Sequence, residues 1–394
     1  MNPRTNPYAP GAGTLPPELT GRDDIIEKVS IQLDRCKNGL SYRGFLMVGL
    51  RGVGKTVLLN HLSLKAEEQN FAVISIETPE KRSLPSLLIP SIRSALLKLD
   101  RVLSTTEHGK KALRVLGGFV NAMKLKYKDI EFGLDLGSEP GIADSGDLEN
   151  DLIDLFIEIG SVAKQKNTAL VLFIDEIQYI KEQEFEALIL ALHKCTQQQL
   201  PLTLVGAGLP QLVGQAGKAK SYAERLFEYP HIGALPSEEA KKALVNPAKN
   251  NNVDFDEEAL NEILRQTEGY PYFLQEWGKH SWNVAKQSPI TKADVTSATE
   301  LAVSELDMSF FRVRFDRLTP SEKRYLRAMA ELGSGPHRSG DIAQLLNKEV
   351  NAVAPIRAKL ISKGMIYSPD HGDNNFTVPL FDQYMKRVMP ELEA

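Results

Sequence analysis

The sequence predicts an α/β domain with a parallel sheet, followed by two smaller units. Three observations support this fold class. From about residue 45 to 230, short apolar runs alternate with longer helical stretches. From about 236 to 308 only helical patterns continue. From about 311 to the end, three helical patterns precede a hairpin-like stretch.

The predicted strands of the first domain are continuous apolar runs and not alternating ones. Such runs are typical of strands buried on both faces of a parallel sheet, and their alternation with helices is typical of an α/β domain. The four runs are Phe45 to Leu50, Phe71 to Glu77, Ala169 to Ile174 and Leu202 to Val205.

The second and third units are predicted from helix-start signals and from element order. Acidic starts at Ser237-Glu238-Glu239 and at Asp254 to Glu258, with Thr291 capping a helix through Met308, indicate a small helical domain. The last unit reads helix, helix, helix, hairpin, which is the order of a winged helix. Its segments are Pro320 to Leu332, Ser339 to Leu346, Val350 to Lys363 and Met365 to Val378, with Asp370 to Asn375 as the turn.

These patterns divide the chain into a Pro-rich N-terminal arm and three domains. The predicted boundaries are 1–17 for the arm, 18–235 for the α/β domain, 236–309 for the helical domain and 310–394 for the winged helix. The arm has two interpretations, a mobile segment or a segment lying along the main site.

Composition excludes several classes of protein. With 394 residues, 42% hydrophobic and 25% charged, the chain has the proportions of an ordinary globular protein. Apolar runs such as Ala187 to Leu192 are far shorter than the roughly 18 residues of a membrane span. Cys36 and Cys195 are isolated, which fits small apolar residues on helices. We therefore expect a cytoplasmic protein without a membrane partner.

Charge and histidine placement add little about function. The net charge is −4, whereas residues 311–394 hold 13 Lys and Arg against 10 Asp and Glu, or +3. That asymmetry is too small to establish a nucleic-acid partner. His61, His193 and His371 lack partners at catalytic spacing, so we interpret them as surface or core residues.

The strongest motif is G-x-x-x-x-G-K-T, placed between a predicted strand and the helix that starts at Val57. Glycines let successive N–H groups face a polyphosphate. In this interpretation Lys55 neutralises the β- and γ-phosphates and the Thr56 hydroxyl ligates Mg²⁺. The residues are Gly49, Leu50, Arg51, Gly52, Val53, Gly54, Lys55 and Thr56, and Val57 completes the predicted ATP-binding segment.

A pair of carboxylates follows the third apolar run. Asp175 and Glu176 stand where that strand ends, and ligands of open α/β sheets bind at this edge. Asp175 is predicted to hold Mg²⁺ through water, and Glu176 to polarise the attacking water. The sequence therefore predicts ATP hydrolysis.

Together these residues resemble AAA+ P-loop ATPases of the initiator and origin-recognition type, a group similar to the STAND signalling ATPases. The resemblance implies a parallel sheet sandwiched by helices, a helical lid and a winged helix. Four further segments carry it: Pro17 to Asp23, Gly206-Ala207-Gly208, Ser221 to Phe227 and Gly269 to Tyr272. It extends over about residues 15 to 380.

The resemblance also implies roles for individual residues. Leu19, Gly21 and Arg22 lie in the element that contacts adenine in these families, and Pro271 packs near the base. Arg225 stands at the position of an arginine finger, which would reach the γ-phosphate on a neighbouring subunit of a homo-oligomer. The other interpretation of Arg225 is an ordinary surface residue.

Two positions depart from the family pattern. Gly206-Ala207-Gly208 offers no polar side chain at the sensor 1 position, which predicts slow hydrolysis. Tyr272 replaces the sensor 2 arginine, leaving no obvious cation from the same chain over the γ-phosphate. We therefore expect Lys55, Arg225 from a second subunit and lid packing to distinguish ATP from ADP.

Residues near 100–147 form a predicted insertion. Lys124 to Leu136 alternate in polarity, which predicts a strand or hairpin arm. This arm either packs on its own domain or contacts a partner.

The winged helix leaves the output of the protein open. Arg338, Lys348, Arg357, Lys359 and Lys363 are the candidate contacts to double-stranded DNA. Against them stand Glu349, Asp370 and Asp373, which would repel DNA. The first hypothesis is an ATP-dependent switch that engages DNA. The alternatives are a signalling ATPase with a protein effector, and a nucleotide-binding module without turnover.

Overall fold

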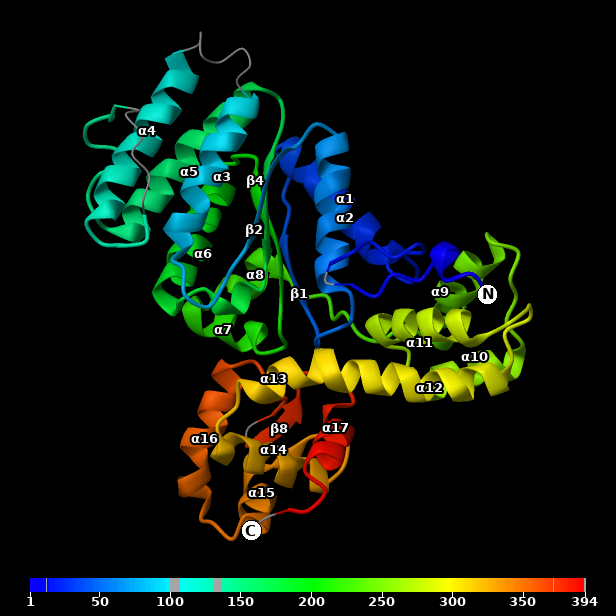
Figure 1. Ribbon diagram of the computed structural model, residues 1–394. Helices are drawn as coiled ribbons and strands as arrows, with labels where there is room; N and C mark the ends of the chain where they lie inside the picture. The colour runs from blue at the N-terminus through cyan, green and yellow to red at the C-terminus, as the bar shows by residue number, and fades with distance from the viewer. Residues whose placement is uncertain (12, 100–106, 131–136, 371, 393–394) are drawn as a thin grey trace.

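The computed structural model describes residues 1–11, 13–99, 107–130, 137–370 and 372–392. Figure 1 shows an α/β domain, a helical lid beside it and a small C-terminal domain beneath both. Within the described residues, no helix combines the length and the hydropathy that a membrane crossing needs.

The α/β domain has a five-stranded sheet in the order β2-β3-β4-β1-β5, and every pairing is parallel. The strands are β1 (Gly44–Val48), β2 (Ala72–Glu77), β3 (Leu170–Asp175), β4 (Leu202–Gly208) and β5 (Phe227–Glu228). The four predicted runs are all strands, and β5 is an additional short one. The predicted parallel-sheet fold is confirmed.

The side chains of each strand alternate between the two faces of the sheet, and helices cover both faces. Leu46 and Val48 belong to one buried cluster and Phe45 and Met47 to another, because successive side chains of a strand point to opposite faces. One face packs against α1 (Asp23–Lys37) and α2 (Lys55–Glu68). The other packs mainly against α3 (Leu84–Leu99), α5 (Leu148–Gln165), α6 (Glu182–Gln197) and α7 (Leu212–Ala219), and α4 (Glu107–Lys124) lies outside them, on α3 and α5. Both faces are therefore dry.

The prediction of a strand from Lys124 onward is wrong for the residues described. The apolar series of α4 repeats at helical spacing to Met123, and Lys124 is the last helical residue. The N–H groups of Lys126 and Tyr127 both bond back to the carbonyl of Met123, which makes a turn and not a ladder. Residues 131–136 of the predicted arm lie outside the described residues.

The lid is an all-helical domain that leads into one long helix. Its helices are α9 (Ser237–Lys249), α10 (Glu257–Thr267), α11 (Pro271–Val284) and α12 (Lys292–Leu306). Thr291 caps α12 in a reciprocal capping box with Asp294, as its sequence signal predicts. A π-helical turn, η4 (Asp307–Phe311), and α13 (Arg312–Asp316) continue the helix directly, so the lid and the last domain share one element.

The C-terminal domain is a winged helix. Its helices α14 (Pro320–Glu331), α15 (Ser339–Leu345) and α16 (Val350–Ser362) precede the antiparallel strands β7 (Ile366–Tyr367) and β8 (Asp373–Phe376). Two elements were not predicted: β6 (His337–Arg338), which pairs with β8, and α17 (Phe381–Val388), which packs on α14. The lid and winged-helix residues share one buried cluster.

Candidate nucleotide site

The segment between β1 and α2 is folded as an anion-binding loop. Gly52 and Gly54 adopt left-handed conformations with φ of 82° and 87°, which side chains rarely tolerate. The ammonium of Lys55 donates to the carbonyls of Gly49 at 3.0 Å and Leu50 at 2.8 Å. Burial lowers the Lys55 pKa to about 8, against the opposing effect of nearby carboxylates. A buried cation at a helix N-terminus is a strong attraction for phosphate.

Thr56 and Asp175 meet across the loop. The Thr56 hydroxyl donates to Asp175 Oδ2 at 2.6 Å, and Asp175 Oδ1 accepts the Glu176 N–H at 2.8 Å. Burial raises the Asp175 pKa, whereas these hydrogen bonds hold it down. A hydroxyl and a carboxylate side by side are the hard oxygen ligands that Mg²⁺ prefers. The donor set therefore fits this metal.

Glu176 is held in place by a residue that the sequence analysis missed. The amide of Gln178, on the short helical turn η3 (Ile177–Tyr179), donates to Glu176 Oε2. The side-chain carbonyl of Gln178 accepts the N–H of Leu209 at 3.1 Å. A Cβ at Gly208 would lie only 2.6 Å from Gln178 Oε1. Gln178 therefore fills the space beside Gly208 from another segment.

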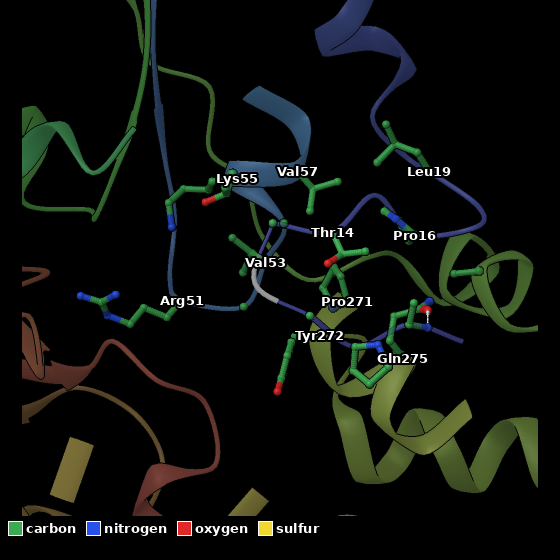
Figure 2. A pocket seen from close by; sticks show the side chains of 18 of the residues that line it. Thr14, Pro16, Leu19, Arg51, Val53, Lys55, Val57, Pro271, Tyr272 and Gln275 are labelled. Carbon is green, nitrogen blue, oxygen red and sulfur yellow. Dashed lines mark hydrogen bonds between the residues drawn. The ribbon is translucent and has the colours of Figure 1, made fainter. Parts of the chain in front are cut away.

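A cavity of about 440 Å³ lies against the loop. Its walls come from the arm, the phosphate loop, the carboxylate pair, the start of α11 and the helix that follows the lid. Figure 2 shows Thr14 and Pro16 of the arm near Pro271 and Tyr272 of the lid, with the phosphate loop between them and the sheet. The volume falls within the range of small-ligand sites.

The N-terminal arm lies along this cavity, so the second interpretation of the arm is the one that the structure shows. Tyr8 is buried, and its hydroxyl donates to the carbonyl of Leu244. Asn6 Nδ2 donates to the carbonyl of Lys279 at 2.9 Å, and the Ala9 N–H donates to Gln275 Oε1 at 3.2 Å. The arm is therefore anchored on lid helices α9 and α11.

The residues expected near adenine divide into two groups. Leu19, Arg22 and Pro271 line the cavity, whereas Gly21 lies under α9, close to Glu239. The Arg22 guanidinium is buried and donates to the carbonyl of Gly233 at 2.6 Å and that of Val53 at 3.3 Å. Arg22 thus ties the base of the arm to the phosphate loop through backbone contacts.

Arg225 lies outside the cavity. It is exposed on α8 (Ala223–Leu226), next to the short edge strand β5. An exposed position fits both interpretations, a finger directed at a second subunit and a surface residue.

The five basic residues proposed for DNA are not equivalent. Arg357 bonds to Asn374, Ser368 and the carbonyl of Asp373, and therefore holds the wing. Lys363 pairs with Glu322 at 2.7 Å. The remaining three, Arg338, Lys348 and Lys359, are exposed. Only these three have side chains available to a partner in this arrangement.

The winged helix touches the phosphate loop directly. The Arg51 N–H donates to the carbonyl of Thr377 at 2.9 Å, and the Arg51 guanidinium donates to the Tyr179 hydroxyl at 2.9 Å. The same guanidinium lies 3.6 Å from Glu176 Oε1. Arg51 thus joins the loop, the carboxylate pair and the winged helix.

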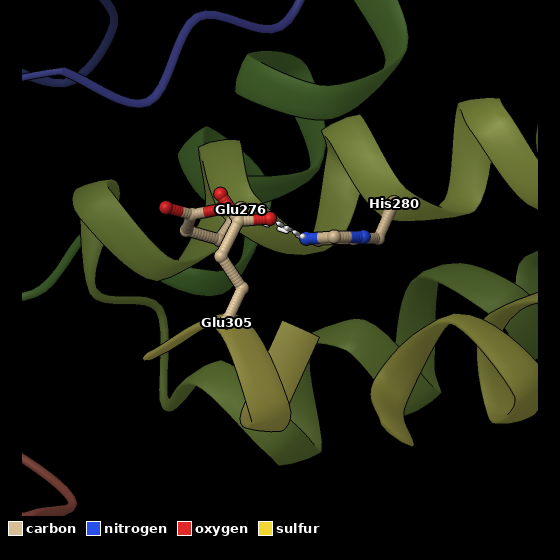
Figure 3. Close-up of side chains that lie close together, drawn as sticks. All are labelled: Glu276, His280 and Glu305. Atoms are coloured by element: carbon tan, nitrogen blue, oxygen red, sulfur yellow. Dashed lines mark ion pairs between the residues drawn. The ribbon is translucent and has the colours of Figure 1, made fainter. Parts of the chain in front are cut away.

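A second group of titratable side chains lies in the lid (Figure 3). Glu276 and His280 lie one turn apart on α11 and face Glu305 on α12, with His280 Nε2 2.9 Å from Glu305 Oε2. Lys279 already pairs with Glu305 at 2.7 Å, and the Tyr272 hydroxyl donates to Glu276 at 3.1 Å. With a lysine inside it, the group is an ion-pair network that joins two lid helices.

Comparisons with known proteins agree with this geometry. Residues 18–205 match the family model described as AAA ATPase domain. Residues 308–385 match a model described as Domain of unknown function (DUF8462). The chain is 22% identical over 372 residues to an uncharacterized HTH-type transcriptional regulator of Methanocaldococcus jannaschii, covering 90% of this chain and 85% of that protein.

Comparison with solved structures gives one match at a TM-score of 0.60, which supports the same fold. The Walker-type ATPase of Pyrococcus abyssi has a TM-score of 0.60 and 17% identity, with 93% of this chain and 96% of that chain covered. The Orc1 protein of Aeropyrum pernix, solved in complex with DNA, has a TM-score of 0.46 and 15% identity, with 95% and 94% covered.

The parallel sheet and the glycine-rich loop before α2 define a P-loop nucleotide-binding protein. Within that class, residues 18–205 are an AAA ATPase domain, and a helical lid and a C-terminal winged helix follow it along the chain.

Proposed function

We propose that this chain is an ATP-dependent switch in which the nucleotide and Mg²⁺ at the phosphate loop set the position of the winged helix, which in turn engages double-stranded DNA. The observation that carries the proposal is the hydrogen bond from the Arg51 N–H to the carbonyl of Thr377. Because the loop itself contacts the winged helix, a ligand that reshapes the loop changes that contact.

The proposed roles follow the geometry. Lys55 and the loop N–H groups bind the phosphates, Thr56 and Asp175 hold Mg²⁺, and Glu176 orients the attacking water. The metal supplies charge neutralisation between phosphate oxygens when it is bound. Leu19 and Pro271, which line the far end of the cavity, contact the base.

DNA is the proposed output because three basic side chains of the winged helix are exposed, and because the archaeal relative bears the name of an HTH-type regulator. The test is duplex binding across salt concentration, with ATP and with ADP. Replacing Arg338, Lys348 and Lys359 together by Ala should reduce the log–log slope by about 0.9 for each phosphate that is no longer neutralised. A matched triple variant at Lys28, Lys65 and Lys164, exposed lysines of the ATPase domain, should leave the slope unchanged.

A second candidate is a signalling ATPase whose winged helix binds a protein. The exposed residues of the first turns of α16 favour it, since Val350, Ala352, Ala354 and Pro355 are small and apolar. A salt slope that is flat in the unchanged protein would support this candidate and contradict DNA engagement.

A further inference from the structure

The lid supplies no charged group over the phosphate loop. At the position where related ATPases carry a lid arginine, Tyr272 directs its hydroxyl to Glu276. Its backbone N–H donates to the carbonyl of Gly52 at 3.1 Å, which places it beside the loop without offering a charge. A positively charged side chain that faces the phosphates from within the same chain must therefore come from a segment outside the lid.

Arg314 lines the same cavity as Lys55, Thr56 and Glu176, although it lies some 260 residues further along the chain than the phosphate loop. It stands on α13, immediately after the π-helical turn η4 in the helix that joins the lid to the winged helix. Such turns change the direction in which the following side chains point, and they are frequent at functional sites. Here the turn leaves Arg314 facing the nucleotide cavity.

Aromatic packing holds the Arg314 side chain in this position. Its guanidinium lies over the Phe310 ring, 4.0 Å from the centroid, and donates to the Phe310 carbonyl. Phe310 in turn stacks on Tyr272 at a centroid distance of 4.8 Å. The charge is therefore positioned by a stack of rings that begins at the lid.

Within the described residues, Arg314 differs from its neighbours Arg312 and Arg317 because no carboxylate lies within ion-pair distance of its guanidinium. Arg312 pairs with Asp316 at 2.9 Å and Arg317 pairs with Glu80 at 3.4 Å, whereas in the described part of the chain Arg314 forms no ion pair. Burial lowers the Arg314 pKa to about 10, and the nearby charge of Arg51 contributes to this lowering. A partly buried guanidinium that faces a cavity without an ion-pair partner is stabilised by an anion.

We propose that Arg314 is the residue that recognises the terminal phosphate of a nucleoside triphosphate from within the same chain. The proposal rests on the proposed function, that the cavity binds ATP. A guanidinium binds phosphate oxygens in a bidentate manner. Because α13 leads directly into the winged helix, this contact fixes that domain against the phosphate loop. A diphosphate leaves Arg314 without its partner.

The experiment compares the affinities of ADP and of a non-hydrolysable ATP analogue by calorimetry. Arg314→Met keeps the length of the side chain and removes its charge. This substitution should lower the affinity for the analogue by about ten- to a hundredfold, which corresponds to the loss of a charge-assisted hydrogen bond. It should lower the affinity for ADP by less than about threefold. Arg314→Lys should restore part of the difference. Arg312→Met, on the same short helix but exposed, is the matched control and should bind both nucleotides normally.

Equal losses for both nucleotides, or no loss for either, would overturn the role of Arg314. Retained ADP binding by Arg314→Met shows that the variant is folded. The proposed function fails separately: in that case the unchanged protein binds neither nucleotide, or Lys55→Ala binds them as tightly as the unchanged protein.

Discussion

The side-chain amide of Gln178 connects Glu176 to the end of β4, since it donates to the Glu176 carboxylate and accepts the N–H of Leu209. It lies where a side chain on Gly208 would project. A polar group is thus present at the sensor 1 position, although the residues of β4 there are small. The expectation that no side chain orients the water at this place is therefore revised.

Removing this amide should slow hydrolysis without weakening ATP binding. In Gln178→Ala the Glu176 carboxylate is free to turn toward Arg51, and misplacement on the scale of 1 Å costs about a hundredfold in rate. Gly208→Ser should act similarly, because its Cβ displaces the side-chain carbonyl of Gln178. Steady-state hydrolysis and ATP affinity, measured on the same samples, check this. An unchanged rate in both variants would contradict it.

The contact of Thr56 with Asp175 predicts how removal of Mg²⁺ changes the affinity for ATP. For the unchanged protein, chelating Mg²⁺ should weaken ATP binding by about tenfold or more, because Thr56 and Asp175 would hold a metal whose charge offsets that of the phosphates. For Asp175→Asn the affinity should be low and nearly indifferent to the chelator. Asp24→Asn, an exposed substitution on α1, serves as the control. If chelation lowers the ATP affinity of Asp175→Asn as much as that of the unchanged protein, Asp175 does not hold the metal.

The pKa of Lys55 predicts that nucleotide affinity falls at alkaline pH. Burial holds this pKa at about 8 in the free protein, whereas bound phosphates favour the charged form. Above pH 8, binding must therefore take up a proton, and the dissociation constant should rise by up to about tenfold per pH unit. Lys55→Arg keeps its charge and should flatten the profile. A flat profile in the unchanged protein would show that Lys55 stays charged without ligand.

The arm should contribute to nucleotide retention. A Cβ at Gly278 would lie 2.6 Å from the Tyr8 ring, so Gly278→Ala should displace the arm from the lid. We expect faster nucleotide dissociation, by about tenfold, and faster tryptic cleavage after the exposed Arg4, because burial of one aromatic side chain stabilises by about 2 kcal/mol. Gly214→Ala, where the added Cβ meets nothing, is the control. Unchanged cleavage and dissociation would rule out this role.

A mixing experiment decides between the two interpretations of Arg225. Arg225→Ala and Lys55→Ala should each hydrolyse ATP poorly alone, the first for lack of a neighbour's arginine and the second for lack of bound nucleotide. Mixed, they should regain activity, since the Lys55→Ala subunit still supplies Arg225. If Arg225→Ala hydrolyses ATP at the normal rate, Arg225 is an ordinary surface residue. Lys218→Ala, nearby and exposed, should behave like the unchanged protein.

The parts of the site that are contiguous in the chain are predictable from the sequence. The loop from Gly49 to Thr56 and the pair at Asp175 and Glu176 are local motifs, and the strand before each is marked by continuous hydrophobicity. Backbone geometry over a few residues determines what such motifs present to a ligand. For this reason the fold class and the centre of the site follow from the sequence.

The remaining parts depend on contacts between distant segments. Gln178 fills the space beside Gly208 because β3 and β4 are neighbours, and Arg314 lines the cavity from α13, just beyond the π-helical turn. Neither juxtaposition has a local sequence signal. Arg357 is a candidate for DNA when the sequence is considered alone, yet its partner Asn374 lies on the wing.

The anchoring of the arm on the lid also determines when, during synthesis, the nucleotide cavity can close. The arm is synthesised before the lid, because Leu244, Gln275 and Lys279, which hold it, are made more than 200 residues later. The wall of the cavity therefore cannot close around a nascent chain that lacks α11. In a growing polypeptide the phosphate loop is complete while the cavity is still open. Tight retention of nucleotide begins only when the lid has been translated and folded.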